Sequence, residues 1–391
     1  MPKVKLLVAW VTLLLVGTDL FVVSPMLGPW SREFGIGLDR AGLAVTGFSV
    51  AYVFSAPFAG SWADRRGRRL ALTVSLAVFA AANLGTALAA GPVMLIVVRV
   101  VAGMAAAGIT PTVFALVGGT AAPEIKAWTL GVATSGLLSA LWLGAPAGAL
   151  LSQWIGWRAV FGCLAGFAVV LLVINRASWS VEPETADGDA RPVAGSAWDK
   201  ATAVLPTTLW AVAVYGVYTY LSSGLRLGEG WSSGAVGVGL ATYGICAVSS
   251  SVAGGRIADR WRPRPLIVTA LLGTAAALLL LGVVVGAAVP VVAVALGVFA
   301  SAAYLVFPAQ QAELLRRFDR ERSAVLAWNQ SAMYVGIAAG SAFGGFVFSR
   351  WAFPVLPFAA AVSAAAGALV ARWVHGPVRS EPSAEHAGRY A

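Results

Sequence analysis

Long apolar runs alternate with short polar segments along the whole chain. A helix needs about 20 mainly apolar residues to cross a bilayer, and runs of this length occur twelve times. The predicted spans are 6–27, 42–63, 70–90, 93–118, 128–151, 157–175, 203–224, 234–257, 265–287, 290–314, 324–348 and 354–374. The pattern therefore predicts an all-α membrane protein with twelve transmembrane helices.

The longest polar segment divides the chain into two halves. It runs from Arg176 to Lys200 and is rich in acidic residues, glycine and proline, a composition typical of a linker. We predict an N-terminal six-helix bundle over 1–176, a cytoplasmic linker over 177–201, a C-terminal six-helix bundle over 202–376 and a cytoplasmic tail over 377–391.

Composition indicates that lipid surrounds these helices. Hydrophobic residues make up 59% of the chain and charged residues 11%, and the mean hydropathy is +0.81, whereas soluble domains carry roughly 25% charged residues. A net charge of +10 is compatible with nucleic acid as a partner. However, the basic residues cluster in short loops between apolar runs, which is how membrane topology is encoded. We therefore expect the lipid bilayer, and no nucleic acid, as a partner.

The distribution of basic residues also predicts the orientation. With the N-terminus in the cytoplasm, 21 of the 27 lysines and arginines fall on the cytoplasmic side, five fall outside, and Arg99 lies within a span. This excess follows the positive-inside rule. We expect a multi-pass protein of the cell membrane with both termini in the cytoplasm.

A ten-residue segment occurs twice. Gly60–Arg69 closes the second span and Gly255–Arg264 closes the eighth, with five identities at an offset of 195 residues, half the chain length. Duplicated six-helix halves are an architecture of secondary transporters, which bind substrate between the halves near the middle of the bilayer. The repeat therefore predicts two pseudo-symmetric bundles.

The first copy resembles the loop signature G-x-x-x-D-R-x-G-R-R of the major facilitator superfamily, and the resemblance covers nearly the whole chain. The matching residues are Gly60, Asp64, Arg65, Gly67, Arg68 and Arg69. The second copy keeps Gly255, Asp259 and Arg260 but has Arg262 and Pro263 in place of a glycine and an arginine. The resemblance implies a gate that stabilises one of two access states, and it implies a monomer. For Gly60 we expect a close approach between two helices.

Further motifs are similar to those of exporter branches of this superfamily. Arg99 and Gly103 resemble the R-x-x-x-G motif of drug:proton antiporters. Gly144, Pro146 and Gly148, followed by Gly156-Trp-Arg, resemble a pattern of arabinose-efflux-type exporters. These resemblances imply a helix-packing role for Gly103, Gly144, Pro146 and Gly148, and they imply a proton-driven exporter.

Asp19 and Arg99 are the residues most suited to proton coupling. Of the 17 acids only Asp19 lies deep within a predicted span, and Arg99 is the only deep base. Each lies about 7 residues from the outer end of its span, or roughly 10 Å at 1.5 Å per residue, so we expect the two to interact. Burial favours the protonated form of an unpaired carboxylate, whereas a nearby arginine favours the charged form. A change in their distance would thus load or release a proton; a structural ion pair is the alternative.

Other polar and aromatic residues in the spans are candidates for a substrate cavity, although interfacial anchoring or helix packing explains the aromatic ones equally well. They are Tyr52, Trp142, Tyr215, Tyr218, Tyr243, Tyr304, Gln310, Asn329 and Tyr334.

Enzyme and ATP-binding motifs are absent from the sequence. No P-loop, G-x-S-x-G or H-E-x-x-H motif occurs, and the two cysteines and two histidines have no metal-ligand spacing. We therefore expect no catalysis, cofactor or metal. The leading interpretation is a secondary-active exporter of a drug or metabolite, driven by proton antiport with alternating access and associated with multidrug resistance. Alternatives are an uncoupled or sugar-type efflux permease, uptake by proton symport, and a non-transporting membrane sensor.

Overall fold

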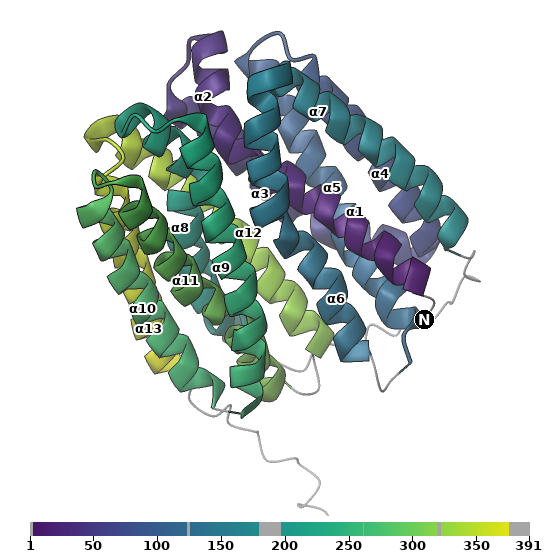
Figure 1. Cartoon of the computed structure of the whole chain (residues 1–391). Helices are drawn as coiled ribbons and strands as arrows, with labels where there is room; N and C mark the ends of the chain where they lie inside the picture. Colours follow the sequence, from purple (N-terminus) through teal and green to yellow (C-terminus); the bar gives the residue numbers. More distant parts are fainter. Residues whose placement is uncertain (1–2, 123–125, 180–196, 261, 319–321, 375–391) are drawn as a thin grey trace, which may run out of the picture.

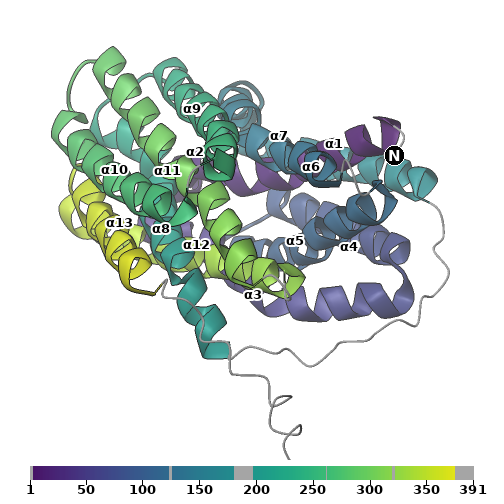
Figure 2. The same ribbon diagram turned by 90° about the horizontal axis from the view of Figure 1, so that it is seen from below.

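A computed structural model describes residues 3–122, 126–179, 197–260, 262–318 and 322–374. Every element in these ranges is helical, and the helices form two bundles that lie side by side (Figures 1 and 2). The all-α fold with two bundles, predicted from the apolar runs and the repeat, is therefore confirmed. Most of the predicted linker and the whole of the predicted tail lie outside the described residues.

The described part of the N-terminal bundle contains seven α-helices and one π-helical turn. They are α1 (Lys3–Phe21), α2 (Val23–Phe34), α3 (Leu38–Arg66), α4 (Arg68–Ala87), α5 (Pro92–Thr120), α6 (Lys126–Ser139), the π-helical turn η2 (Ala140–Gly144) and α7 (Ala145–Ser178).

In the C-terminal bundle, the described residues form six α-helices and one π-helical turn. They are α8 (Ala197–Ser223), the π-helical turn η3 (Gly224–Gly228), α9 (Ser233–Arg260), α10 (Pro263–Val284), α11 (Val289–Arg317), α12 (Arg322–Trp351) and α13 (Val355–Val374).

One helical segment is long enough for two membrane crossings. Within the described residues, 11 helices are long and apolar enough to span a membrane, and one of them, Thr129–Ser178, has 50 residues. At 1.5 Å per residue it is about 75 Å long, more than twice the thickness of the hydrocarbon core. It bends at Gly156, whose φ of 78° is a left-handed conformation that favours glycine. Counted as two crossings, this segment brings the total to the predicted twelve.

The first predicted span differs most from the structure. The apolar run suggested one span over 6–27, whereas α1 ends at Phe21 and α2 continues to Phe34. Pro25 has no N–H group to donate to the carbonyl of Phe21, four residues earlier, so the helix is interrupted at this point. The break at Val22 lies three residues beyond Asp19.

The two bundles contact each other through equivalent helices. Helix α3 packs against α12, and α9 packs against η2 and α7. The repeat relates α3 to α9, because Gly60 and Gly255 occupy matching positions in them. If one half is superposed on the other, the contact of α3 with α12 therefore takes the place of the contact of α9 with η2 and α7, as the predicted pseudo-symmetry requires. Helix α2 adds a contact with α8.

Small residues allow α8 and α12 to approach closely. A Cβ atom at Gly340 of α12 would lie 2.6 Å from the carbonyl oxygen of Val212 and 3.1 Å from the backbone nitrogen of Gly216, both in α8. Close backbone approach through small residues is a main source of helix association in lipid. Gly340 of α12 thus has a direct role in the packing of this helix against α8.

An equivalent hydrogen bond joins two helices at one end of each bundle. Arg69 at the start of α4 donates from Nη2 to the carbonyl oxygen of Arg176 in α7, at 2.6 Å. Arg264 at the start of α10 donates in the same way to the carbonyl oxygen of Arg372 in α13. The duplication therefore extends from the motif to its contacts. We call the end that holds these four arginines the basic end and the opposite end the far end (Figure 1).

Replacing Gly340 by leucine should destabilise the C-terminal bundle, because the new side chain would overlap the backbone of α8. Overpacking of a tight contact costs about 1–3 kcal/mol, so we expect a clear fall of the melting temperature in detergent. Gly166→Leu is the control, since a Cβ atom at Gly166 meets nothing within 4 Å. Equal melting temperatures for the two variants would show that the Gly340 contact does not matter for stability.

Candidate functional site

Asp19 and Arg99 form a buried, bidentate ion pair. Arg99 Nη1 lies 2.7 Å from Asp19 Oδ1, and Nη2 lies 2.9 Å from Oδ2. Nη2 also lies 3.4 Å from the backbone carbonyl oxygen of Asp19. Both side chains are 0% exposed. The two residues thus meet as their matching depths predict, although 80 residues separate them in the chain.

Aromatic rings enclose the guanidinium group. Its central carbon lies 5.1 Å from the ring centre of Phe48 in α3 and 5.6 Å from that of Phe161 in α7. Arginine is attracted to such rings by cation–π interaction. The Nε atom of Arg99 is buried without a hydrogen-bond partner among the described residues. The pair is therefore held by α1, α3, α5 and α7 and has no contact with solvent.

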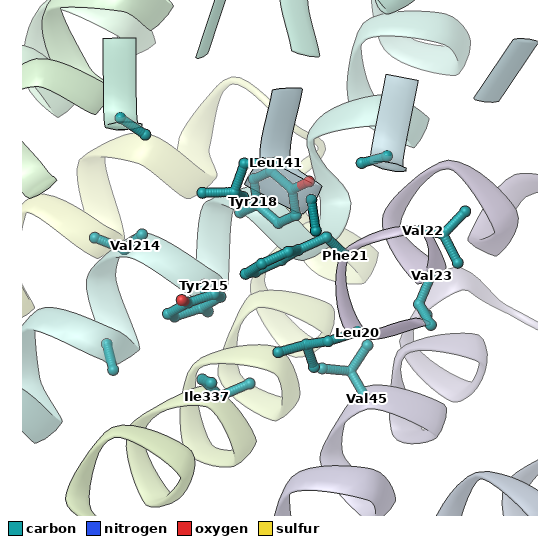
Figure 3. Packing of buried hydrophobic residues seen from close by; sticks show 14 of the residues in the cluster. Leu20, Phe21, Val22, Val23, Val45, Leu141, Val214, Tyr215, Tyr218 and Ile337 are labelled. Carbon is teal, nitrogen blue, oxygen red and sulfur yellow. The ribbon is translucent and has the colours of Figure 1, made fainter. Parts of the chain in front are cut away.

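Phe21, which lies in the same helix as Asp19, contacts the C-terminal bundle. Its ring lies 6.2 Å from the ring of Tyr215 and 5.6 Å from that of Tyr218, both in α8. Figure 3 shows Phe21 pointing toward these two tyrosines. Just beyond the break, Ser24 Oγ donates to the carbonyl oxygen of Tyr218 at 2.7 Å. The segment around Asp19 is thus attached directly to the C-terminal bundle.

A cluster of four buried tyrosines lies on the C-terminal side of this contact. Tyr215 and Tyr218 of α8 are joined by Tyr243 of α9 and Tyr304 of α11, with ring centres 5.2 Å apart for Tyr218–Tyr243 and 6.0 Å apart for Tyr243–Tyr304. The hydroxyl of Tyr218 is buried without a hydrogen-bond partner among the described residues. A buried polar group without a partner costs roughly 1–3 kcal/mol, so packing alone does not explain a tyrosine at this position.

Two further candidates stack across the interface of the bundles. The rings of Tyr52 in α3 and Tyr334 in α12 lie 3.7 Å apart and nearly parallel, with an interplanar angle of 18°. Four of the nine cavity candidates, namely Tyr52, Tyr215, Tyr218 and Tyr334, thus contact the opposite bundle, and Tyr243 and Tyr304 pack behind Tyr218 within the C-terminal bundle.

The other three cavity candidates lie apart from the tyrosines. Gln310 Nε2 donates to the carbonyl oxygen of Ala203 at 2.7 Å, and Asn329 Oδ1 accepts from Thr207 Oγ1 at 2.5 Å. Thr207 precedes Tyr215 by eight residues, or about 12 Å along α8, so these amides tie α11 and α12 to α8 nearer the basic end. Trp142 is 39% exposed on η2.

The predicted packing motif makes close helix contacts. A Cβ atom at Gly103 would overlap the backbone of Phe48, one at Gly144 the side chain of Thr18, and one at Gly148 the side chain of Val22. Pro146 is buried in the first turn of α7. These contacts hold α1 and α3 against the helices that carry Arg99 and Phe161.

The loop motif shows one feature that differs from our expectation. Gly67 joins α3 to α4 with φ of 88°, a conformation that favours glycine, and Arg68 approaches Gly119 of α5. However, a Cβ atom at Gly60 or at Gly255 would meet nothing within 4 Å. The expected close approach at Gly60 is therefore wrong for this conformation.

The charged residues of the two loop motifs lie at the basic end. Asp64, Arg65 and Arg260 are exposed, and the side chain of Asp259 is outside the described part of the chain.

A second ion pair at the far end was not predicted. Glu33 of α2 accepts from Arg158 Nη2 and from Trp157 Nε1, each at 2.5 Å, and Arg158 also donates to the carbonyl oxygen of Ala89 at 2.9 Å. Both charged side chains are 41% exposed. Arg158 was visible as part of a motif, but nothing in the sequence links it to Glu33, 125 residues away.

Comparison with known proteins identifies the family of this chain. The sequence pattern of the Major Facilitator Superfamily matches residues 9–229 and 207–389. The uncharacterized MFS-type transporter YbcL of Bacillus subtilis is 26% identical over 87% of this chain and 88% of its own length. The chloramphenicol resistance protein of Streptomyces lividans is 28% identical over 66% of each chain. The crystal structure of a D-xylose–proton symporter is similar in fold, with a TM-score of 0.81 at 16% identity over 97% of this chain and 99% of that one. The chain belongs to the Major Facilitator Superfamily of membrane transporters.

Proposed function

We propose that this transporter exports a small organic compound, a drug or a metabolite, in exchange for protons by alternating access. The observation that carries the proposal is the buried Asp19–Arg99 pair beside the interface of the bundles. Asp19 is the only fully buried acid among the residues whose burial is described. The similarity to a chloramphenicol resistance protein supports export of an organic compound.

Protonation of Asp19 would change the forces in the site. Arginine stays charged at all relevant pH values, so a proton that neutralises the carboxylate removes the attraction that holds the bidentate pair. Arg99 would then be a buried cation beside a neutral partner, a costly arrangement in a low-dielectric interior. The site therefore favours a rearrangement whenever Asp19 gains a proton.

Such a rearrangement would reach the other bundle through the residues next to the break in the first span. Asp19 lies two residues before Phe21, whose ring contacts Tyr215 and Tyr218 of the other bundle. A shift of α1 that separates Asp19 from Arg99 would move Phe21 against these rings. Proton binding in one half is thereby linked to the position of the other.

The tyrosine cluster is our candidate for the substrate contact. Its rings offer apolar faces, and Tyr218 offers a buried hydroxyl without a partner among the described residues. This combination suits an organic compound with an apolar body and few polar groups. We propose that a substrate enters between the bundles and packs against these rings.

Contacts between the bundles indicate which end is closed. Near the far end, Ser341 Oγ of α12 donates to the carbonyl oxygen of Gly42 in α3 at 3.0 Å. At the basic end, Gly60 and Gly255 face open space. We propose that the basic end lies in the cytoplasm and that these two glycines make their close approach when that end closes.

Asp19→Asn should abolish coupling, because asparagine cannot bind and release a proton. In liposomes that contain a pH-sensitive dye, a panel of lipophilic cations, antibiotics and sugars would be screened for compounds that collapse an imposed proton gradient. With the wild type we expect at least one active compound, and with Asp19→Asn at least a tenfold lower rate of proton movement.

Glu33→Gln is the matched control, because Glu33 also pairs with an arginine but is half-exposed at the far end. We expect this variant to stay within about threefold of the wild-type rate, since exposed ion pairs contribute little. Wild-type coupling in Asp19→Asn would make the buried pair structural. Substrate movement that is equally fast without a gradient would replace antiport by an uncoupled permease.

Gly60→Leu should block transport without unfolding the protein. The new side chain fits the present conformation but would obstruct a closing basic end, so we expect an unchanged melting temperature and at least a tenfold loss of transport. Gly166→Leu, on a surface with the same open space, should transport like the wild type. Full activity of Gly60→Leu would exclude a close approach at this position.

A further inference from the structure

A hollow at the basic end of the C-terminal bundle collects arginines from three helices. It has a volume of about 700 Å³ and is lined by Arg262 and Arg264 at the start of α10, Arg316 near the end of α11 and Arg372 near the end of α13. These helices belong to one bundle (Figure 2). Glu313 is the one acid among the described lining residues. Among the described lining residues, four arginines against one glutamate leave a net charge of +3.

Topology alone does not account for this convergence. The positive-inside rule requires basic residues on the cytoplasmic side, but it does not require them to face a common hollow. At an offset of 195 residues the N-terminal half has Gly67 and Ala121 where the C-terminal half has Arg262 and Arg316. The N-terminal half still forms the equivalent bond from Arg69 to the Arg176 carbonyl. The duplicated scaffold therefore does not need these two arginines.

Arginines in such an arrangement are suited to phosphate. The planar guanidinium group pairs with phosphate oxygens through two parallel hydrogen bonds, and converging like charges repel one another until an anion lies between them. The bond from Arg264 to the Arg372 carbonyl joins two walls of the hollow. An excess of three positive charges suits a ligand with more than one phosphate charge.

The hollow lies where the apolar spans begin. Its arginines flank Pro265 and Val268, which belong to the lining and to the apolar span Pro263–Val284. Trp373, next to Arg372, is exposed, and tryptophan is typical of the boundary between hydrocarbon and headgroups. Basic pockets between transmembrane helices on the cytoplasmic side suit anionic lipid headgroups.

We propose that this hollow is a phosphate-binding site, filled by the headgroup of an anionic phospholipid such as diphosphatidylglycerol or by a soluble phosphate. The site is separate from the Asp19–Arg99 pair and does not depend on the proposed transport function. Arg262 and Arg316 bind phosphate oxygens, while Arg264 and Arg372 hold the walls together and contribute charge.

Binding to the purified full chain in detergent tests the site. Native mass spectrometry would titrate the protein with diphosphatidylglycerol and, for comparison, with phosphatidylcholine. We expect the double variant Arg262→Gln/Arg316→Gln to bind diphosphatidylglycerol at least tenfold more weakly than the wild type. Arg256→Gln/Arg260→Gln removes the same charge from exposed positions on α9 at the same end and should stay within threefold.

Inorganic phosphate separates the two sources of ligand. If equilibrium dialysis detects binding of millimolar inorganic phosphate that the Arg262→Gln/Arg316→Gln variant loses, the phosphate site stands and takes a soluble ligand. If only diphosphatidylglycerol shows this dependence, the site stands and takes a headgroup. Equal weakening by both double variants, or no weakening by either, would overturn the proposal, because binding would then follow total charge or ignore these arginines.

Discussion

A charged group inside a bilayer needs a partner, and the arrangement of the N-terminal bundle follows from this need. Asp19 and Arg99 neutralise each other at 2.7 Å, and neither has another charge of opposite sign within its reach among the described ion pairs. Four helices converge on the pair, and glycines at 103, 144 and 148 let them come close enough. Removal of either charge leaves the other without compensation, so both the stability and the proposed coupling depend on one interaction.

The two halves have the same scaffold but different chemistry at its centre. The matching bonds of Arg69 with Arg176 and of Arg264 with Arg372 show how closely the scaffold was duplicated. Yet at the offset of 195 residues Val214, next to Tyr215, takes the place of Asp19. One half thus supplies a pair of charges, and the other supplies aromatic rings with hydroxyl groups. In the proposed mechanism, this division places proton binding in one half and substrate contact in the other, while the helices keep their symmetric contacts.

The sequence predicted the features that lipid enforces. Apolar runs located the spans, and the depth of two isolated charges in those runs predicted that Asp19 and Arg99 meet. Side chains whose environment depends on three-dimensional packing were not predictable: Phe48 and Phe161 are ordinary apolar residues in the sequence, yet their rings enclose Arg99. Likewise, Gln310 and Asn329 were grouped with the tyrosines by polarity, whereas each bonds to α8 nearer the basic end.

The bend at Gly156 leaves no loop between the fifth and sixth crossings. Because the segment Thr129–Ser178 is helical on both sides of a single residue, its two arms are joined directly at the bend. One arm holds the backbone of Leu141 against Gly244 of the opposite bundle, and the other arm carries Phe161 beside Arg99. A displacement of the opposite bundle would therefore also act on the ring next to the buried charge, by a second route between the halves that does not involve the first helix.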